Sequence, residues 1–172
     1  MNIATHACAP VAAALAIDAV RLHSGRDRLF SRGRLIAIGC AGALPDLLNP
    51  HLALSARYSS WTHTLWFVLA AYPVYAIICR TWFRQRWILL TNCLWLATVA
   101  HLATDTVSNG TRPLYPWGPV IAWRLVRGGF IHWLRFDLAF ILATVVLALW
   151  TRRLERRQVS STPRARSPAA SR

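Results

Sequence analysis

Five apolar stretches, separated by segments that carry arginine, constrain the fold of this chain more than any other feature. They run over Ile3–Val20, Arg34–Leu48, Trp61–Cys79, Trp87–Thr104 and Phe136–Trp150. Each is near the lower end of the roughly 17–25 residues that an α-helix needs to cross a bilayer. The pattern predicts an all-α fold, a polytopic membrane helical bundle with four to five transmembrane helices. The second and fifth stretches are short, and re-entrant segments buried against neighbouring helices are an alternative for these two.

The composition agrees with a membrane domain followed by a polar tail. Hydrophobic residues make up 55% of the 172 residues and charged residues only 15%, whereas soluble domains average about 25% charged residues. We expect residues 1–151 to form the membrane-embedded domain. Residues 152–172 are expected to be a basic, disordered cytoplasmic tail, because their later part is dominated by Ser, Pro, Ala and Arg.

The arginines fall mainly on one side of the predicted bundle. If all five stretches span, fifteen of the twenty lie on one side: Arg21, Arg26, Arg28, Arg32, Arg34, Arg80, Arg84, Arg86, Arg152, Arg153, Arg156, Arg157, Arg164, Arg166 and Arg172. The other five are Arg57, Arg112, Arg124, Arg127 and Arg135. This bias is typical of the positive-inside rule and predicts an outside N-terminus and a cytoplasmic C-terminus. It also accounts for the net charge of +14 without a nucleic-acid partner, which we do not expect.

Ionisable residues gather at the predicted outer ends of the helices. His6 and His63 lie at the starts of apolar stretches, Asp46 and Asp105 lie at the ends of others, and His101 lies four residues before Asp105. That last spacing places both side chains on one helix face, one turn apart. Ionisable groups in membrane segments usually mark functional sites, because they are costly to bury in lipid. Imidazole and carboxylate ligands together predict a divalent metal ion, with zinc or manganese the best candidates.

A catalytic metal centre needs about three protein ligands and one open position. We expect His63, His101 and Asp105 to be that minimal set. Asp46 would be a further ligand or the catalytic base that orients water, and His6 a weaker ligand or a neighbour of the metal. A metal held in this way lowers the pKa of its bound water, which predicts a hydrolase.

Structural roles are the alternative for several of these residues. His6 would then be an interfacial or capping residue, and Asp46 a turn residue beside Pro45. Thr62 would cap the third helix ahead of His63. At the level of the whole protein, the alternative is a non-enzymatic membrane protein, either a metal-ion or proton transporter or an inactive scaffold. Three further residues on the outer side are weaker candidates: His51, His132 and Asp137.

Two outer arginines suggest a substrate class. Arg57 and Arg112 would hold an anionic group, such as a phosphate, through paired hydrogen bonds. The expected partners are membrane lipids and a small-molecule or lipid-linked substrate with a phosphoester or ester bond. The segment Pro116–Trp133 contains three tryptophans and several arginines, which is typical of an interfacial lid at the outer membrane surface.

Several short motifs occur in an order that resembles a known family. They are Thr5-His6, Gly42-Ala-Leu-Pro-Asp46, Ser60-Trp-Thr-His63-Thr64 and His101-Leu-Ala-Thr-Asp105, followed by a Gly110–Pro116 loop. Over about residues 1–120 this order resembles the YdjM-like membrane-bound metal-dependent hydrolases. The resemblance implies a multi-pass protein of the bacterial inner membrane with a hydrolase-type metal centre.

Two positions depart from the family pattern. Leu48 stands where the family often has a second aspartate, and Tyr58 stands where it often has a further histidine. The loss of two potential ligands predicts either a centre with fewer metal ions or a weakened, inactive site.

Overall fold

The protein is a bundle of α-helices in the computed structural model, which describes residues 3–50, 54–108, 110–125 and 130–161. The helices are α1 (Ile3–His23), α2 (Arg32–Leu48), α3 (Leu65–Trp82), α4 (Trp87–Ser108) and α5 (Phe130–Ser161). Two short 3-10 helices, η1 (Leu54–Ser59) and η2 (Trp61–His63), lie between α2 and α3. Within the described ranges, strand-like pairing is limited to one bridge between Thr111 and Ile121. The predicted all-α class is confirmed.

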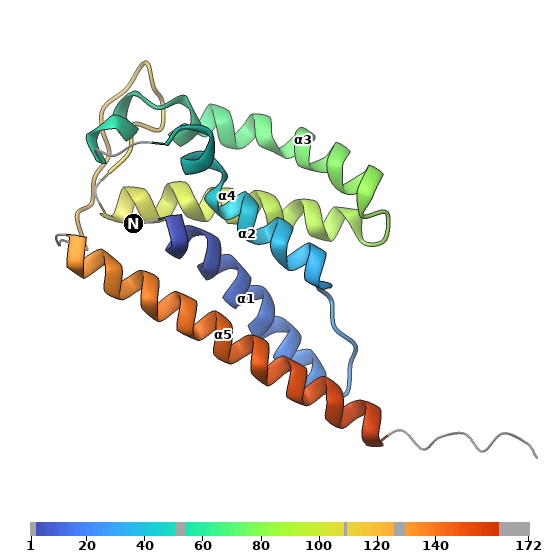
Figure 1. The fold of residues 1–172 in the computed structure, drawn as a ribbon. Helices are drawn as coiled ribbons and strands as arrows, with labels where there is room; N and C mark the ends of the chain where they lie inside the picture. The colour runs from blue at the N-terminus through green and yellow to red at the C-terminus, as the bar shows by residue number, and fades with distance from the viewer. Residues whose placement is uncertain (1–2, 51–53, 109, 126–129, 162–172) are drawn as a thin grey trace, which may run out of the picture.

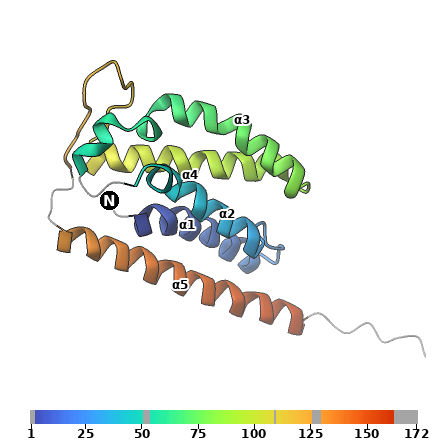
Figure 2. The same cartoon turned by 45° about the horizontal axis from the view of Figure 1, so that its top comes forward.

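The helices lie side by side in the order α5, α1, α2, α4, α3 (Figures 1 and 2). Helices that follow one another along the chain run in opposite directions, so the connections between them gather at the two ends of the bundle. The loop end contains the start of α1, η1, η2 and residues 110–125 (Figure 1). The arginine-rich end contains the α1–α2 link, the α3–α4 turn and the last turns of α5. Among the described residues, this alternation separates the two sets of arginines as the sequence predicts.

Four of the helices, α1, α3, α4 and α5, are long and apolar enough to cross a membrane. Helix α2 has 17 residues, about 25 Å of helix, and packs between α1 and α4. Large apolar side chains such as Ile77, Leu96 and Leu142 are exposed on the outer faces. Aromatic, aliphatic and small residues such as Phe30, Leu90 and Ala97 fill the interior. This pattern fits helices that contact lipid.

Helix α5 is longer than the sequence predicts. It begins before Phe136 and continues past Trp150 to Ser161. The turns added after Trp150 are rich in Arg and include Glu155 and Gln158, which favour helix although they are polar. The turns added before Phe136 are mostly apolar. Residues 152–161, assigned to the disordered tail, are therefore helical, and residues 162–172 lie outside the described residues.

Helix α3 begins later than the sequence predicts. Residues 61–63 form η2, and α3 starts at Leu65. The N-cap is Thr64, whose hydroxyl accepts a hydrogen bond from the Phe67 amide at 3.2 Å. The capping role expected for Thr62 is wrong, and His63 lies before the helix instead of inside it.

The predicted interfacial segment divides into two parts. Residues up to 125 form an irregular loop in which Trp117 and Trp123 are exposed, as expected for side chains at a membrane surface. Trp133, by contrast, lies in α5 and is buried, while residues 126–129 lie outside the described residues.

Candidate metal centre

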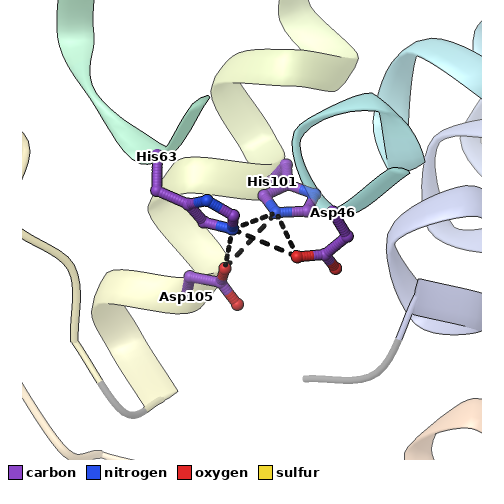
Figure 3. A group of neighbouring side chains, drawn as sticks. All are labelled: Asp46, His63, His101 and Asp105. Carbon is purple, nitrogen blue, oxygen red and sulfur yellow. Dashed lines mark hydrogen bonds and ion pairs between the residues drawn. The ribbon is translucent and has the colours of Figure 1, made fainter. Parts of the chain in front are cut away.

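Four potential metal ligands meet at the loop end of the bundle. Helix α4 carries His101 and Asp105 one turn apart, the last turn of α2 carries Asp46, and η2 carries His63. Their side chains point toward one another (Figure 3). One ligand atom from each residue lies within 4.8 Å of those of the other three. Residues far apart in the sequence thus form one cluster, which we call the four-residue cluster.

The distances within the four-residue cluster suit a small cation. Asp46 Oδ1 lies 3.1 Å from His63 Nε2 and 3.6 Å from His101 Nε2. Asp105 Oδ2 lies 3.3 Å from His101 Nε2 and 3.5 Å from His63 Nε2, and the two Nε2 atoms are 3.3 Å apart. Ligands held about 2.0–2.2 Å from a tetrahedral zinc ion are roughly 3.3–3.6 Å from one another. Five of the six separations among these four atoms are therefore close to the edges of a tetrahedron around one divalent ion.

The proton on His101 points away from the cluster. Its Nδ1 lies 2.7 Å from the carbonyl oxygen of Gly42. A carbonyl oxygen can only accept a hydrogen bond, so Nδ1 is the donor. In the neutral ring, Nε2 then carries a lone pair that faces the cluster, as in metal-ligating histidines.

His63 is oriented in the same way by hydroxyl groups. Its Nδ1 lies 3.1 Å from Thr62 Oγ1, which donates its own proton to the Pro45 carbonyl at 2.9 Å. The Thr62 hydroxyl can therefore accept from Nδ1 but not donate to it, and in the tautomer with the proton on Nδ1 the lone pair of Nε2 faces the cluster. Burial lowers the pKa of the His63 imidazole, which outweighs the raising effect of the Asp46 carboxylate. The neutral ring presents another lone pair to the two carboxylates, and a cation among these acceptors would remove their mutual repulsion.

The four-residue cluster is accessible mainly beside Asp46. The side chains of His63, His101 and Asp105 are at most 1% exposed, whereas that of Asp46 is 10% exposed. A water molecule or substrate would therefore approach from the α2 side.

His6 and Arg57 contact the cluster through the second oxygen of Asp105. His6 Nε2 lies 3.1 Å from Asp105 Oδ1, and its ring stacks on that of His101 with 3.8 Å between centroids. Arg57 Nη1 donates to the same Oδ1 at 2.6 Å. Both side chains are buried. His6 is thus a neighbour of the four-residue cluster, and Arg57 is an internal cation.

Arg112 lies apart from these residues in the loop that follows α4. It is partly exposed, and its Nε donates to the Gly118 carbonyl at 2.7 Å. Its guanidinium lies 5.6 Å from the centre of the Tyr115 ring. Of the two predicted substrate-binding arginines, Arg112 is the more accessible.

The weaker candidates have other surroundings. Asp137 of α5 accepts hydrogen bonds from the backbone amide of Thr5 at 3.0 Å and from the Thr5 hydroxyl, which ties α5 to the first turn of α1. The His132 ring contacts that of Trp133. His51 lies outside the described residues.

The sequence did not predict which residues orient the two histidines. Gly42 supplies the acceptor for His101, and Ser60 and Thr62 surround Nδ1 of His63. A glycine in a helix interior can indicate close packing, so Gly42 had a detectable signal. The carbonyl and hydroxyl roles had none, because they depend on how distant segments meet.

The positions that depart from the family pattern lie beside the centre. Leu48 is exposed at the end of α2, and Tyr58 is partly buried in η1. Neither position carries a carboxylate or imidazole that could take part as a ligand.

Comparison with known proteins agrees with the sequence motifs. No curated protein and no solved structure matches the chain. The family described as YdjM inner membrane protein matches residues 1–165, which covers every element of the bundle described above. The chain therefore belongs to the YdjM inner membrane protein family and is a multi-pass protein of the inner membrane.

Proposed function

We propose that this protein is a membrane-bound, metal-dependent hydrolase whose centre is formed by Asp46, His63, His101 and Asp105. The observation that carries the proposal is the set of five separations, 3.1–3.6 Å, that join two imidazole nitrogens and two carboxylate oxygens into one cluster. This mixed nitrogen and oxygen donor set suits zinc or manganese.

The exposed fractions suggest how the four residues divide the work. His63, His101 and Asp105 are enclosed and would hold the metal. Asp46 is at the accessible side, where it would either complete the ligand set or act as a base that orients the attacking water and takes its proton. A divalent ion bound here would lower the pKa of water and polarise the bond to be cleaved.

The position of the centre supports a substrate at the outer membrane surface. The centre lies at the loop end, opposite the arginine-rich end, and the positive-inside rule would place the loop end outside the cytoplasm. Arg112 is one of the solvent-accessible arginines at this end that could hold an anionic group. A phosphoester or lipid-linked substrate would fit these surroundings.

Transport is a less well supported function. A conduit for protons or metal ions needs polar groups through the depth of the bundle. Below the centre, the interior is filled mainly by apolar residues, including Ile38, Ala71, Leu90 and Leu94. The concentration of ionisable groups at one end favours a site over a path.

The first test is the metal content of detergent-purified protein, measured by mass spectrometry. We expect about one equivalent of zinc or manganese in the wild type and its loss in His101→Ala and in Asp105→Ala. His132→Ala is the matched control, because that imidazole contacts Trp133 outside the four-residue cluster, and this variant should keep its metal.

Hydrolysis is tested on the same samples with phosphoester and lipid ester substrates. We expect turnover by the wild type and His132→Ala only, with Asp46→Asn retaining metal but losing most of the rate if Asp46 is the base. A wild type that binds no added metal would refute the hydrolase proposal. Metal binding without turnover of any substrate class would favour an inactive scaffold.

A further inference from the structure

We propose that Arg57 takes the place of a second cation beside the four-residue cluster, so that the centre holds one metal ion and not two. This inference rests on the proposed function, because it concerns the same metal centre. It assigns Arg57 a role inside the protein in place of substrate binding.

The Asp105 carboxylate faces two different sets of groups. Its Oδ2 is near His101 Nε2 and His63 Nε2, at 3.3 and 3.5 Å. Its Oδ1 is near Arg57 Nη1 and His6 Nε2, at 2.6 and 3.1 Å. In two-metal hydrolytic sites the ions are about 3.5–4 Å apart, a separation that one carboxylate can bridge. Asp105 is arranged like a carboxylate that bridges two metal ions, but the Arg57 guanidinium lies at Oδ1, where the second ion would bind.

Burial makes the charge of Arg57 significant. The Arg57 side chain is 3% exposed and that of Asp105 is fully buried. Charges in such surroundings interact strongly and are little screened by solvent. Without a metal ion, Arg57 offsets one of the two carboxylate charges at the centre. With one divalent ion, a second ion would meet direct repulsion from the guanidinium.

His6 lies outside the four-residue cluster and could be a ligand of a second metal ion. Its Nε2 is on the Oδ1 side of Asp105, where it would be a second ligand if a metal ion replaced the guanidinium. Removal of the Arg57 charge should therefore create a second, weaker position with His6 and Asp105 Oδ1 as protein ligands.

The test is a manganese titration of purified protein, followed by equilibrium dialysis and electron paramagnetic resonance. The wild type should bind one equivalent and give the spectrum of an isolated Mn²⁺ ion. Arg57→Gln removes the charge and supplies an amide oxygen, so a second equivalent and a spin-coupled spectrum are expected. Arg57→Lys keeps the charge and should bind one. Arg112→Gln, the matched loss of an arginine outside the centre, should also bind one.

His6 variants separate this proposal from a general change in affinity. Combining His6→Ala with Arg57→Gln should remove the second equivalent and leave the first. His6→Ala alone should still bind one equivalent.

Each contrary result has a distinct meaning. Two coupled ions in the wild type, or one equivalent in folded Arg57→Gln, would overturn the role of Arg57 and leave the metal centre intact. A wild type without bound manganese or zinc would overturn the metal centre as well. If the Arg57 variants do not fold, the wild-type spectrum still decides whether the centre holds one ion or two, and two coupled ions would overturn the proposal.

Discussion

Gly42 brings α1 and α2 into close contact beside the four-residue cluster. A Cβ atom at this position would lie 2.2 Å from the His6 carbonyl oxygen and 2.9 Å from Pro10 Cγ. The Gly42 carbonyl also accepts the proton of His101 Nδ1. One residue without a side chain therefore controls both the approach of His6 and the orientation of His101.

We predict that Gly42→Ala destabilises the protein and lowers its metal affinity. The added methyl group overlaps backbone, which cannot move without shifting a helix, and such overpacking typically costs about 1–3 kcal/mol. Gly33→Ala in the same helix is the control, because its Cβ would meet only Phe83 Cε1 at an ordinary 3.8 Å. Thermal unfolding in detergent, followed by circular dichroism, should show a lower midpoint for Gly42→Ala alone. Equal midpoints and equal metal contents would contradict this account.

The residues of the four-residue cluster could be predicted from the sequence, but the residues that surround and orient them could not. The positions of Asp46, His63, His101 and Asp105 at the ends of apolar stretches predicted that they would converge, and the structure brings them together. The burial of Arg57 was not predictable, because an arginine in a loop has the same sequence signature whether it faces solvent or a buried carboxylate.

At the level of elements, hydropathy predicted the existence of each helix better than its ends. Helices α1, α2 and α4 contain the predicted stretches, with two to four further residues at one end. Helix α3 starts later than predicted, after its cap Thr64. Helix α5 extends beyond both ends of its predicted stretch, and its C-terminal extension consists mainly of polar residues that favour helix.

The contact between α5 and α1 provides an element-scale prediction. Asp137 accepts from the Thr5 amide, one of the first-turn N–H groups that have no partner within their own helix. Asp137→Ala should leave that buried donor unsatisfied, at a cost of about 1–3 kcal/mol, and should lower the unfolding midpoint. Its metal content should match the wild type, because Asp137 is outside the four-residue cluster.

Two further variants are controls for Asp137→Ala: Asp137→Asn for its effect on stability and Asp105→Ala for its metal content. The asparagine variant keeps an acceptor for Thr5 and should lose less stability than Asp137→Ala. Asp105→Ala should lose its metal. Loss of metal from Asp137→Ala with an unchanged midpoint would show that this carboxylate is a ligand and not a helix contact.

At the scale of the whole molecule, the two ends of the bundle have different chemistry. The loop end carries the four-residue cluster and the exposed Trp117 and Trp123, whereas the other end carries most of the arginines. Arginine bias orients membrane proteins with the richer side in the cytoplasm. A hydrolase with this orientation would act on the outer face of the inner membrane.

Cysteine labelling tests this orientation directly. The four native cysteines would be replaced by serine or alanine, and Trp117→Cys or Val159→Cys would be introduced singly. These residues are 71% and 75% exposed at opposite ends of the bundle, so a reagent should reach either one. A membrane-impermeant maleimide should label Trp117→Cys in intact spheroplasts, and Val159→Cys only after the membrane is permeabilised.

The labelling pattern distinguishes orientation from folding, because each variant is its own control before and after permeabilisation. The reverse pattern would place the metal centre in the cytoplasm and contradict the arginine argument, while leaving the cluster geometry and its metal chemistry unaffected. The expected pattern would restrict the substrate to molecules exposed on the outer leaflet or in the periplasm. Phosphoesters confined to the cytoplasm would then be excluded, because the bundle interior between the two ends is mainly apolar and provides no evident path for a charged substrate.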